Sequence, residues 1–206
     1  MTAESAASST GAAGAREAPP ARPVPLVNIA NVLTVSRLVL VPVFLAALFA
    51  AGGHDTTWRW VATGVFALAS ITDRIDGDLA RRRGLVTDFG KIADPIADKA
   101  LTGAGLIGLS LLGDLFWWAT LVIIGRELLV TALRFWVIRH GVIPASRGGK
   151  IKTLLQALAI GAYLIPFPAA VEPLRWAVLA AALLATVVTG LDYLVRALRL
   201  RAGRSG

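Results

Sequence analysis

The chain has 206 residues, of which 56% are apolar and 17% are charged, and it contains no cysteine. Soluble domains have about 45–50% apolar and about 25% charged residues, so this chain carries too little polar surface for a water-facing globule. The composition therefore predicts a polytopic membrane protein. The lack of cysteine excludes disulfide-stapled folds, thiolate catalysis and cysteine-ligated metals.

Residues 1–25 are rich in Ala, Ser, Gly and Pro without a period, which predicts a disordered tail. Six apolar runs follow, at 35–51, 58–72, 100–112, 115–138, 152–170 and 174–194. Because a membrane-spanning helix needs about 20 residues, the second and third runs reach that length only with their polar neighbours. The runs predict an all-α polytopic membrane protein with a six-transmembrane-helix domain over residues 26–198, followed by a basic cytoplasmic tail over 199–206.

The net charge of +8 comes from 21 Lys and Arg residues against 13 Asp and Glu residues. If both termini face the cytoplasm, 17 of the 21 basic residues lie on the cytoplasmic side, whereas only Arg59 and Arg175 lie on the other side. Cytoplasmic loops of membrane proteins collect Lys and Arg, so the pattern predicts a multi-pass protein of the cell membrane, surrounded by lipids. Topology accounts for the basic charge, and no nucleic-acid partner is expected.

An acidic block separates the second and third runs. Six of the 13 acidic residues lie between Asp73 and Asp98. Asp73 and Asp76 are spaced i, i+3, and Asp94 and Asp98 are spaced i, i+4, so each pair shares one face of a helix. If the segment around Gly84 turns the chain back, the two helices run antiparallel and the four carboxylates converge. A solvated, salt-bridged loop is the alternative, and the paired helical spacing disfavours it.

Four converging carboxylates would repel one another unless a cation joined them. Oxygen ligands without nearby His or Cys select Mg²⁺, Mn²⁺ or Ca²⁺ over zinc or copper. Two such ions bridged by carboxylates form a clamp for phosphoryl displacement. Small residues on the same helices let a phosphate approach the backbone closely. The block therefore predicts a metal-dependent site, with both termini and the site on the cytoplasmic side.

The block also resembles the signature of the CDP-alcohol phosphatidyltransferases, D-x-x-D-G-x-x-A-R, eight further residues, and G-x-x-x-D-x-x-x-D. Every fixed position of that signature is filled, by Asp73, Asp76, Gly77, Ala80, Arg81, Gly90, Asp94 and Asp98. Segments 28–34, 124–127, 145–153 and 189–193 resemble the bacterial phosphatidylglycerophosphate synthase branch of that family, so the resemblance extends over nearly all of residues 28–193.

The resemblance implies a six-helix membrane bundle, usually a homodimer, with CDP-diacylglycerol as donor. It implies two Mg²⁺ ions, for which Mn²⁺ can substitute, held by the four motif aspartates, with Asp98 as general base. The donor's CDP part would be contacted by Asn31, Thr34, Gly77, Ala80, Arg81, Thr87 and Gly90. The expected reaction transfers a phosphatidyl group to an alcohol and releases CMP.

The acceptor is indicated by basic residues. Arg126 and Arg134 are eight residues apart in the fourth run, so both can face inward, and an arginine inside a membrane marks a site by default. With the resemblance, the phosphate of sn-glycerol 3-phosphate would be bound by Arg126, Arg134, Ser146, Lys150 and Lys152. An internal ion pair of Arg126 with Glu127, and the positive-inside pattern, are the alternatives for these residues.

Other functions stay open at this point. Inositol phosphate, or phosphatidylglycerol as in a cardiolipin synthase, could be the acceptor in the same chemistry. A divalent-cation transporter is the alternative from a different class. It is disfavoured because the acidic residues lie at one end and do not continue through the other helices.

Overall fold

The computed structural model describes residues 29–83, 88–137 and 147–202. Inside these ranges, the side chains at 29–31, 73–83, 88–95, 98, 134–135, 137, 147 and 202 are not described. The predicted motif side chains therefore lie mostly outside the described set, whereas the helices that carry them lie within it.

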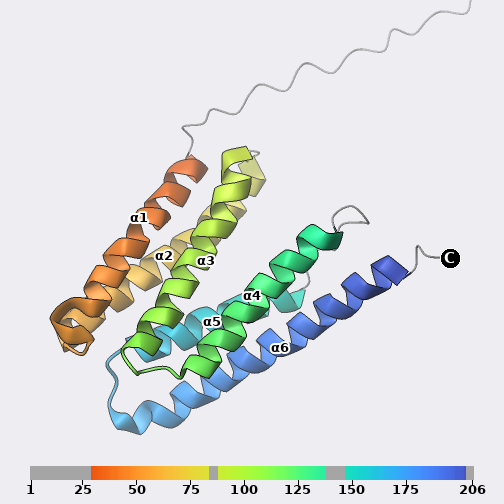
Figure 1. Cartoon of the computed structure of the whole chain (residues 1–206). Helices are drawn as coiled ribbons and strands as arrows, with labels where there is room; N and C mark the ends of the chain where they lie inside the picture. Colours follow the sequence, from red (N-terminus) through yellow and green to blue (C-terminus); the bar gives the residue numbers. More distant parts are fainter. Residues whose placement is uncertain (1–28, 84–87, 138–146, 203–206) are drawn as a thin grey trace, which may run out of the picture.

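The described residues form six α-helices that run alternately up and down (Figure 1). These helices are α1 (Ile29–Phe49), α2 (Thr56–Arg83), α3 (Asp88–Leu111), α4 (Trp117–Val137), α5 (Arg147–Leu164) and α6 (Glu172–Ala202), with short 3₁₀ turns η1 (Ala50–Gly53) and η2 (Ala169–Val171). The all-α architecture with six helices, predicted from the sequence, is confirmed for this part of the chain. As predicted, α2 and α3 continue through the charged block.

The C-terminal ends of α5 and α6 differ from the sequence prediction. Helix α5 ends at Leu164 instead of continuing to residue 170, because Pro166 lacks an N–H and its ring clashes with the carbonyl four residues earlier. Arg175 of α6 instead donates from Nε to the Ala162 carbonyl at 3.0 Å and from Nη2 to the Ile165 carbonyl at 2.7 Å. Helix α6 continues to Ala202, so residues 199–202, which were assigned to a basic tail, are its last turn.

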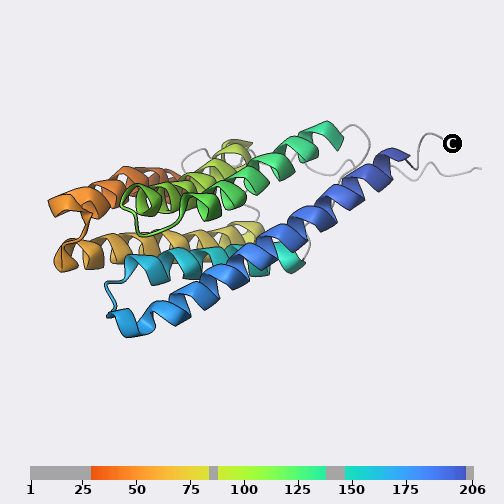
Figure 2. The same cartoon turned by 60° about the horizontal axis from the view of Figure 1, so that its bottom comes forward.

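The alternating direction of the helices gives the bundle two chemically different ends. We call the first the motif end, because α2 ends there and α3 begins there (Figure 1). We call the second the turn end, because it holds η1, the α3–α4 turn and η2. Figure 2 shows α6 crossing the bundle obliquely along its length.

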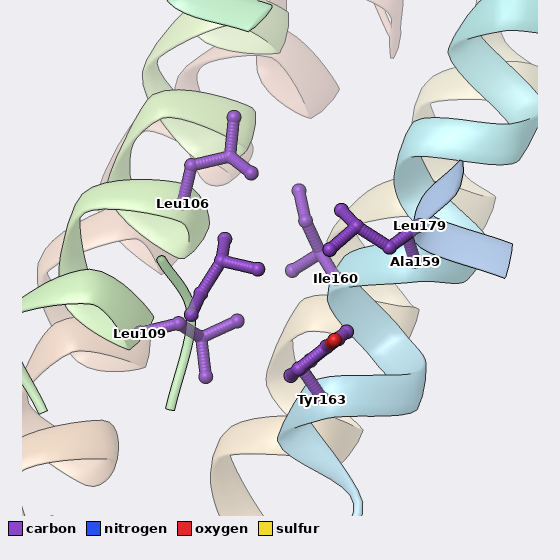
Figure 3. Close-up of a pocket in the computed structure, with 7 residues that line it drawn as sticks. Leu106, Leu109, Ala159, Ile160, Tyr163 and Leu179 are labelled. Atoms are coloured by element: carbon purple, nitrogen blue, oxygen red, sulfur yellow. The ribbon is translucent and has the colours of Figure 1, made fainter. Parts of the chain in front are cut away.

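A single apolar cluster fills the turn end. It comes from the last turns of α1, α3 and α5 and from the first turns of α2, α4 and α6, and its largest fully buried members include Phe44, Leu48, Leu106, Leu109, Ile123, Ile160, Leu164 and Leu179. Figure 3 shows Leu106 and Leu109 of α3 facing Ile160 of α5 in this cluster. The gap between them is lined by apolar side chains and Tyr163 and leaves no room for a water molecule, so it is core packing and not a ligand site.

The turn end is also held by an ion pair. Arg59, in the first turns of α2, is only 6% exposed and donates from Nη2 to Oδ2 of Asp114 in the α3–α4 turn. The exposed His54 has Nε2 3.7 Å from Oδ1 of the same carboxylate. Arg59 and Arg175, the two basic residues assigned to the outer side, are thus both bonded locally.

The outer surface of the bundle is strongly apolar. Large exposed side chains occur on every helix and include Val39, Leu68, Ile107, Leu121, Leu158 and Leu184. Within the described residues, two helical segments, Val32–Gly53 and Ala169–Arg201, are long and apolar enough to cross a membrane. An apolar exterior of this extent is unusual for a soluble monomer.

Candidate active site

The backbone brings the two halves of the acidic motif to the same end of the bundle. Asp73 and Asp76 lie on the second half of α2, with Gly77, Ala80 and Arg81, whereas Gly90, Asp94 and Asp98 lie on the first half of α3. The helices are antiparallel and are joined through residues 84–87 (Figure 1). Thr87 lies in that connection, outside the described residues.

The predicted site residues lie well inside the helices. Asp73 is ten residues before the end of α2, Asp98 is ten residues after the start of α3, and Arg126 is eleven residues before the end of α4. At 1.5 Å per residue, each lies roughly 15 Å along its helix from the motif end. Asp73, Asp98 and Arg126 therefore all lie about three turns inside the helices that carry them.

Helix α1 brings two polar side chains to the same end. Thr34 is 3% exposed and Arg37 is 2% exposed, and their i, i+3 spacing puts them on one face. Helix α1 packs against both α2 and α3, so this face lies beside the motif helices. Asn31 is one turn earlier on α1. Arg37 was counted only among the cytoplasmic basic residues, although a charge inside an apolar run is a signal that could have identified it.

A polar cluster joins α4, α5 and α6. Arg126 donates from Nη1 to Oε1 of Glu127 at 3.1 Å, and Lys152 of α5 donates from Nζ to the same oxygen. The Lys152 residue is only 5% exposed, and the Arg126 side chain is 14% exposed. The predicted Arg126–Glu127 ion pair is present, but one carboxylate oxygen is shared by two cations.

Lys99 connects the motif helix to this cluster. Its ammonium group donates to the hydroxyl of Thr131 on α4, and that hydroxyl donates to the Glu127 carbonyl at 2.7 Å. Lys99 directly follows Asp98 in α3. The turn of α3 that carries Asp98 is therefore fixed against the turn of α4 that carries Arg126 and Glu127.

The cluster is rich in cations. Lys99, Arg126 and Lys152 lie around one carboxylate, that of Glu127, among the described side chains. Cations that lie this close together attract an anion, because opposite charges lower the cost of burying each other. A phosphate group suits this cluster because a guanidinium and an ammonium can both donate to its oxygens.

Helix α6 holds the other side of Arg126. Nη2 of Arg126 donates to Oγ1 of Thr189 at 3.0 Å. A methyl group built on Gly190 would lie 3.0 Å from Cγ of Arg126, so the arginine stem occupies the space next to that glycine. The segment 189–193 stood out in the sequence only as part of the family resemblance. Its contact with α4 could not be read from the spacing.

The remaining predicted acceptor residues are placed differently. Lys150 is exposed, two residues from the buried Lys152 and therefore on the opposite side of α5. Arg134 lies on α4 two turns beyond Arg126, where its side chain is not described, and Ser146 lies outside the described residues. The side chains that the structure describes include no cluster of three His, Asp or Glu that could hold a metal, and the four motif aspartates are outside that set.

Comparisons with known proteins identify the family. Residues 27–188 match the family model for CDP-alcohol phosphatidyltransferase. A probable phosphatidylglycerophosphate synthase from Mycobacterium tuberculosis H37Rv is 59% identical over 172 residues, which cover 84% of this chain and 82% of that protein.

More distant relatives carry a related name. A CDP-diacylglycerol–glycerol-3-phosphate 3-phosphatidyltransferase from Bacillus subtilis is 37% identical over 179 residues, which cover 81% of this chain and 93% of that protein. The protein of the same name from Escherichia coli K12 is 35% identical over 142 residues, covering 65% and 74%. The match of the family model over most of the chain and these identities show that the chain belongs to the CDP-alcohol phosphatidyltransferase family.

Proposed function

We propose that the protein transfers the phosphatidyl group of CDP-diacylglycerol to sn-glycerol 3-phosphate, forming phosphatidylglycerophosphate and CMP. The observation that carries the proposal is the buried cluster in which Arg126 and Lys152 share one oxygen of Glu127 beside the turn that carries Asp98. Relatives with this activity in their names match four fifths of the chain.

The protein acts as a multi-pass enzyme of the cell membrane, with the motif end at the cytoplasmic face. Two helical segments are long and apolar enough to span, and the exposed side of the bundle is apolar. The other helices reach spanning length by combining apolar residues with the charged block, as α2 does with 28 residues. The family resemblance also implies a homodimer.

The donor set of the motif fits a hard divalent cation, since Asp73, Asp76, Asp94 and Asp98 offer only carboxylate oxygens. Two Mg²⁺ ions, or Mn²⁺ in their place, would be held by these four residues. When bound, the ions would offset the negative charge on the phosphate oxygens of the donor.

The reaction is a direct displacement at the phosphorus that carries diacylglycerol. The 1-hydroxyl oxygen of glycerol 3-phosphate forms a bond to this phosphorus, and the bond from phosphorus to the bridging oxygen of CMP breaks. Asp98 takes the hydroxyl proton, because an alcohol with a pKa far above 7 must lose it during attack. CMP leaves with the electron pair, and no residue of the chain becomes phosphorylated.

The CDP part of the donor lies against the motif helices and α1. Small residues at Gly77, Ala80 and Gly90 allow close approach of the pyrophosphate to the backbone. Arg81, Thr87, Asn31 and Thr34 complete this proposed pocket, and the acyl chains extend into the surrounding lipid.

The acceptor assignment rests on charge. A phosphate monoester carries about −1.5 to −2 charges at pH 7, which suits a site with the cations Arg126 and Lys152. Arg134, Ser146 and Lys150 would contribute from the motif end of α4 and α5. Neutral alcohols such as inositol offer these cations no opposite charge. Inositol phosphate, a phosphatidylglycerol acceptor and cation transport are outcomes that the following test separates.

The test measures CMP release by the purified full-length chain in detergent with CDP-diacylglycerol, Mg²⁺ and one acceptor at a time. We expect release with glycerol 3-phosphate, none with inositol phosphate, inositol or phosphatidylglycerol, and loss of activity with EDTA.

Asp98→Asn should lower kcat by several orders of magnitude while donor binding persists, since a carboxamide cannot take the proton. Activity with inositol phosphate alone would overturn the acceptor assignment. No CMP release with any alcohol would overturn the enzyme assignment.

A further inference from the structure

Arg126 is bonded at both terminal nitrogens to protein groups from two helices. Nη1 donates to Glu127 on its own helix, and Nη2 donates to Thr189 on α6. Two anchors on different helices fix the plane of a guanidinium group. Each terminal nitrogen has two N–H bonds, so one N–H on each is left for an oxygen of a ligand.

The hydroxyl oxygen of Thr189 is oriented to accept the hydrogen bond from Arg126. Its hydroxyl donates to the Ala185 carbonyl, one turn back in α6, at 2.6 Å. Because the hydroxyl proton is directed at the backbone, the lone pairs of Oγ1 face outward and accept from Arg126. The residue therefore acts as a fixed acceptor for the cation.

Gly190 provides the space beside that anchor. A methyl group at this position would lie 3.0 Å from Cγ and 3.5 Å from Nε of Arg126. The contact with Nε is an ordinary one, but at 3.0 Å the Cγ atom must give by a few tenths of an ångström, so a larger residue would displace the arginine stem. Thr189 and Gly190 together determine where the guanidinium can lie.

We propose that Thr189 and Gly190 are positioning residues that orient Arg126 for the phosphate of the acceptor, and thereby set the affinity for phosphorylated alcohols. The proposal rests on the proposed function, in which Arg126 binds that phosphate. Thr189 and Gly190 do not contact the donor in this scheme, so their effect is confined to the acceptor.

The chain contains a matched control one turn away. Thr186 is buried, donates to the Ala182 carbonyl at 2.6 Å and accepts from Nε2 of Gln156 at 3.1 Å. It has the same local geometry as Thr189, but its partner is a neutral amide. Substitution of either threonine by valine removes one interhelical hydrogen bond of α6, and only one of these bonds ends on a cation.

The experiment compares T189V, T189S, G190A and T186V in the CMP-release assay, with each substrate titrated separately. Because hydrogen bonds to charged groups are strong, T189V should raise the KM for glycerol 3-phosphate roughly 10-fold or more, with kcat and the donor KM within about two-fold. T189S should restore the KM, G190A should raise it, and T186V should leave it unchanged. In an Arg126→Ala background, T189V should have no further effect.

An equal increase in KM for T186V and T189V, or a loss of kcat with an unchanged acceptor KM, would overturn the proposal. If T189V does not accumulate in membranes, G190A gives the same readout with the hydroxyl still in place. If the wild-type chain uses inositol phosphate and not glycerol 3-phosphate, the acceptor assignment fails, and the same comparison with inositol phosphate still decides the positioning role. Turnover of an acceptor without any phosphate would overturn both.

Discussion

Glu127 lies between the buried Lys152 and the partly buried Arg126 of the candidate active site. Without it, the two cations would repel each other in surroundings of low polarity. With it, they share one negatively charged partner. In the proposed acceptor site this carboxylate therefore stabilises the fold and at the same time limits how strongly the site attracts anions.

Removing this carboxylate should destabilise the bundle. Glu127→Gln removes the charged partner that the two cations share, and we expect the free energy of unfolding in detergent to fall by about 1–3 kcal/mol, less than for a fully buried pair because the side chains are partly exposed. Thermal unfolding of the purified protein measures this loss.

Asp192→Asn is the control for that substitution. It breaks the exposed i, i+4 pair of Asp192 with Arg196, in which the two side chains are 45% and 50% exposed. Such a pair contributes about 0.3–0.5 kcal/mol, so little change is expected. If the two variants unfold at the same temperature, Glu127 does not hold the cluster together.

For individual residues, the sequence predicted which of them belong to the candidate site better than it predicted the partners they contact. Arg126 and Lys152 were expected to bind the acceptor, and the structure places them on one carboxylate. Lys150 was expected beside them, but α5 turns it outward. The contacts of Arg126 with Thr189 and Gly190 could not be predicted, because they depend on the rotation of α6 against α4, which helical spacing does not encode.

At the level of elements, the turn between α1 and α2 depends on glycine. Gly52 and Gly53 have φ values of +75° and +80°, which side-chain-bearing residues rarely adopt. Gly52 has open space where a Cβ would be, whereas a Cβ at Gly53 would lie 2.3 Å from Cδ2 of Leu112. Both positions require a positive φ, but only Gly53 also lacks the space for a side chain.

Alanine substitutions should separate these two effects. Gly52→Ala should cost about 1–2 kcal/mol of unfolding free energy from the backbone alone. Gly53→Ala should cost about 2–4 kcal/mol, since it also overpacks the contact with Leu112. Thermal unfolding in one detergent compares them. Equal losses would show that Leu112 moves aside without cost. Neither variant should change a KM, because the turn lies at the far end from the motif.

The elements themselves were largely predictable. Apolar runs located all six helices, and the acidic spacing predicted that α2 and α3 continue through the charged block. The end of α5 was wrong, because Pro166 ends the helix inside an apolar run. Apolarity continues through such a run whether or not its backbone is helical, so the pattern alone could not show this end.

For the whole molecule, the orientation in the membrane is a prediction that the absence of cysteine makes easy to test. Single cysteines at His54, exposed at the turn end, and at Lys150, exposed at the motif end, are unique labels in this chain. A membrane-impermeant maleimide applied to intact cells of a bacterial host should label His54→Cys. Lys150→Cys should react only after permeabilisation. The reverse pattern would place the motif outside the cell.

The dense apolar packing is centred on the turn end and reaches to about one turn from Asp73, Asp98 and Arg126. Most of the apolar contacts that hold the bundle together therefore lie away from the reacting groups. Substitutions among the polar residues of the site would change which alcohol is accepted, while the apolar core at the turn end keeps the bundle folded. A lineage built on such a scaffold can diversify its lipid products without having to reinvent its fold.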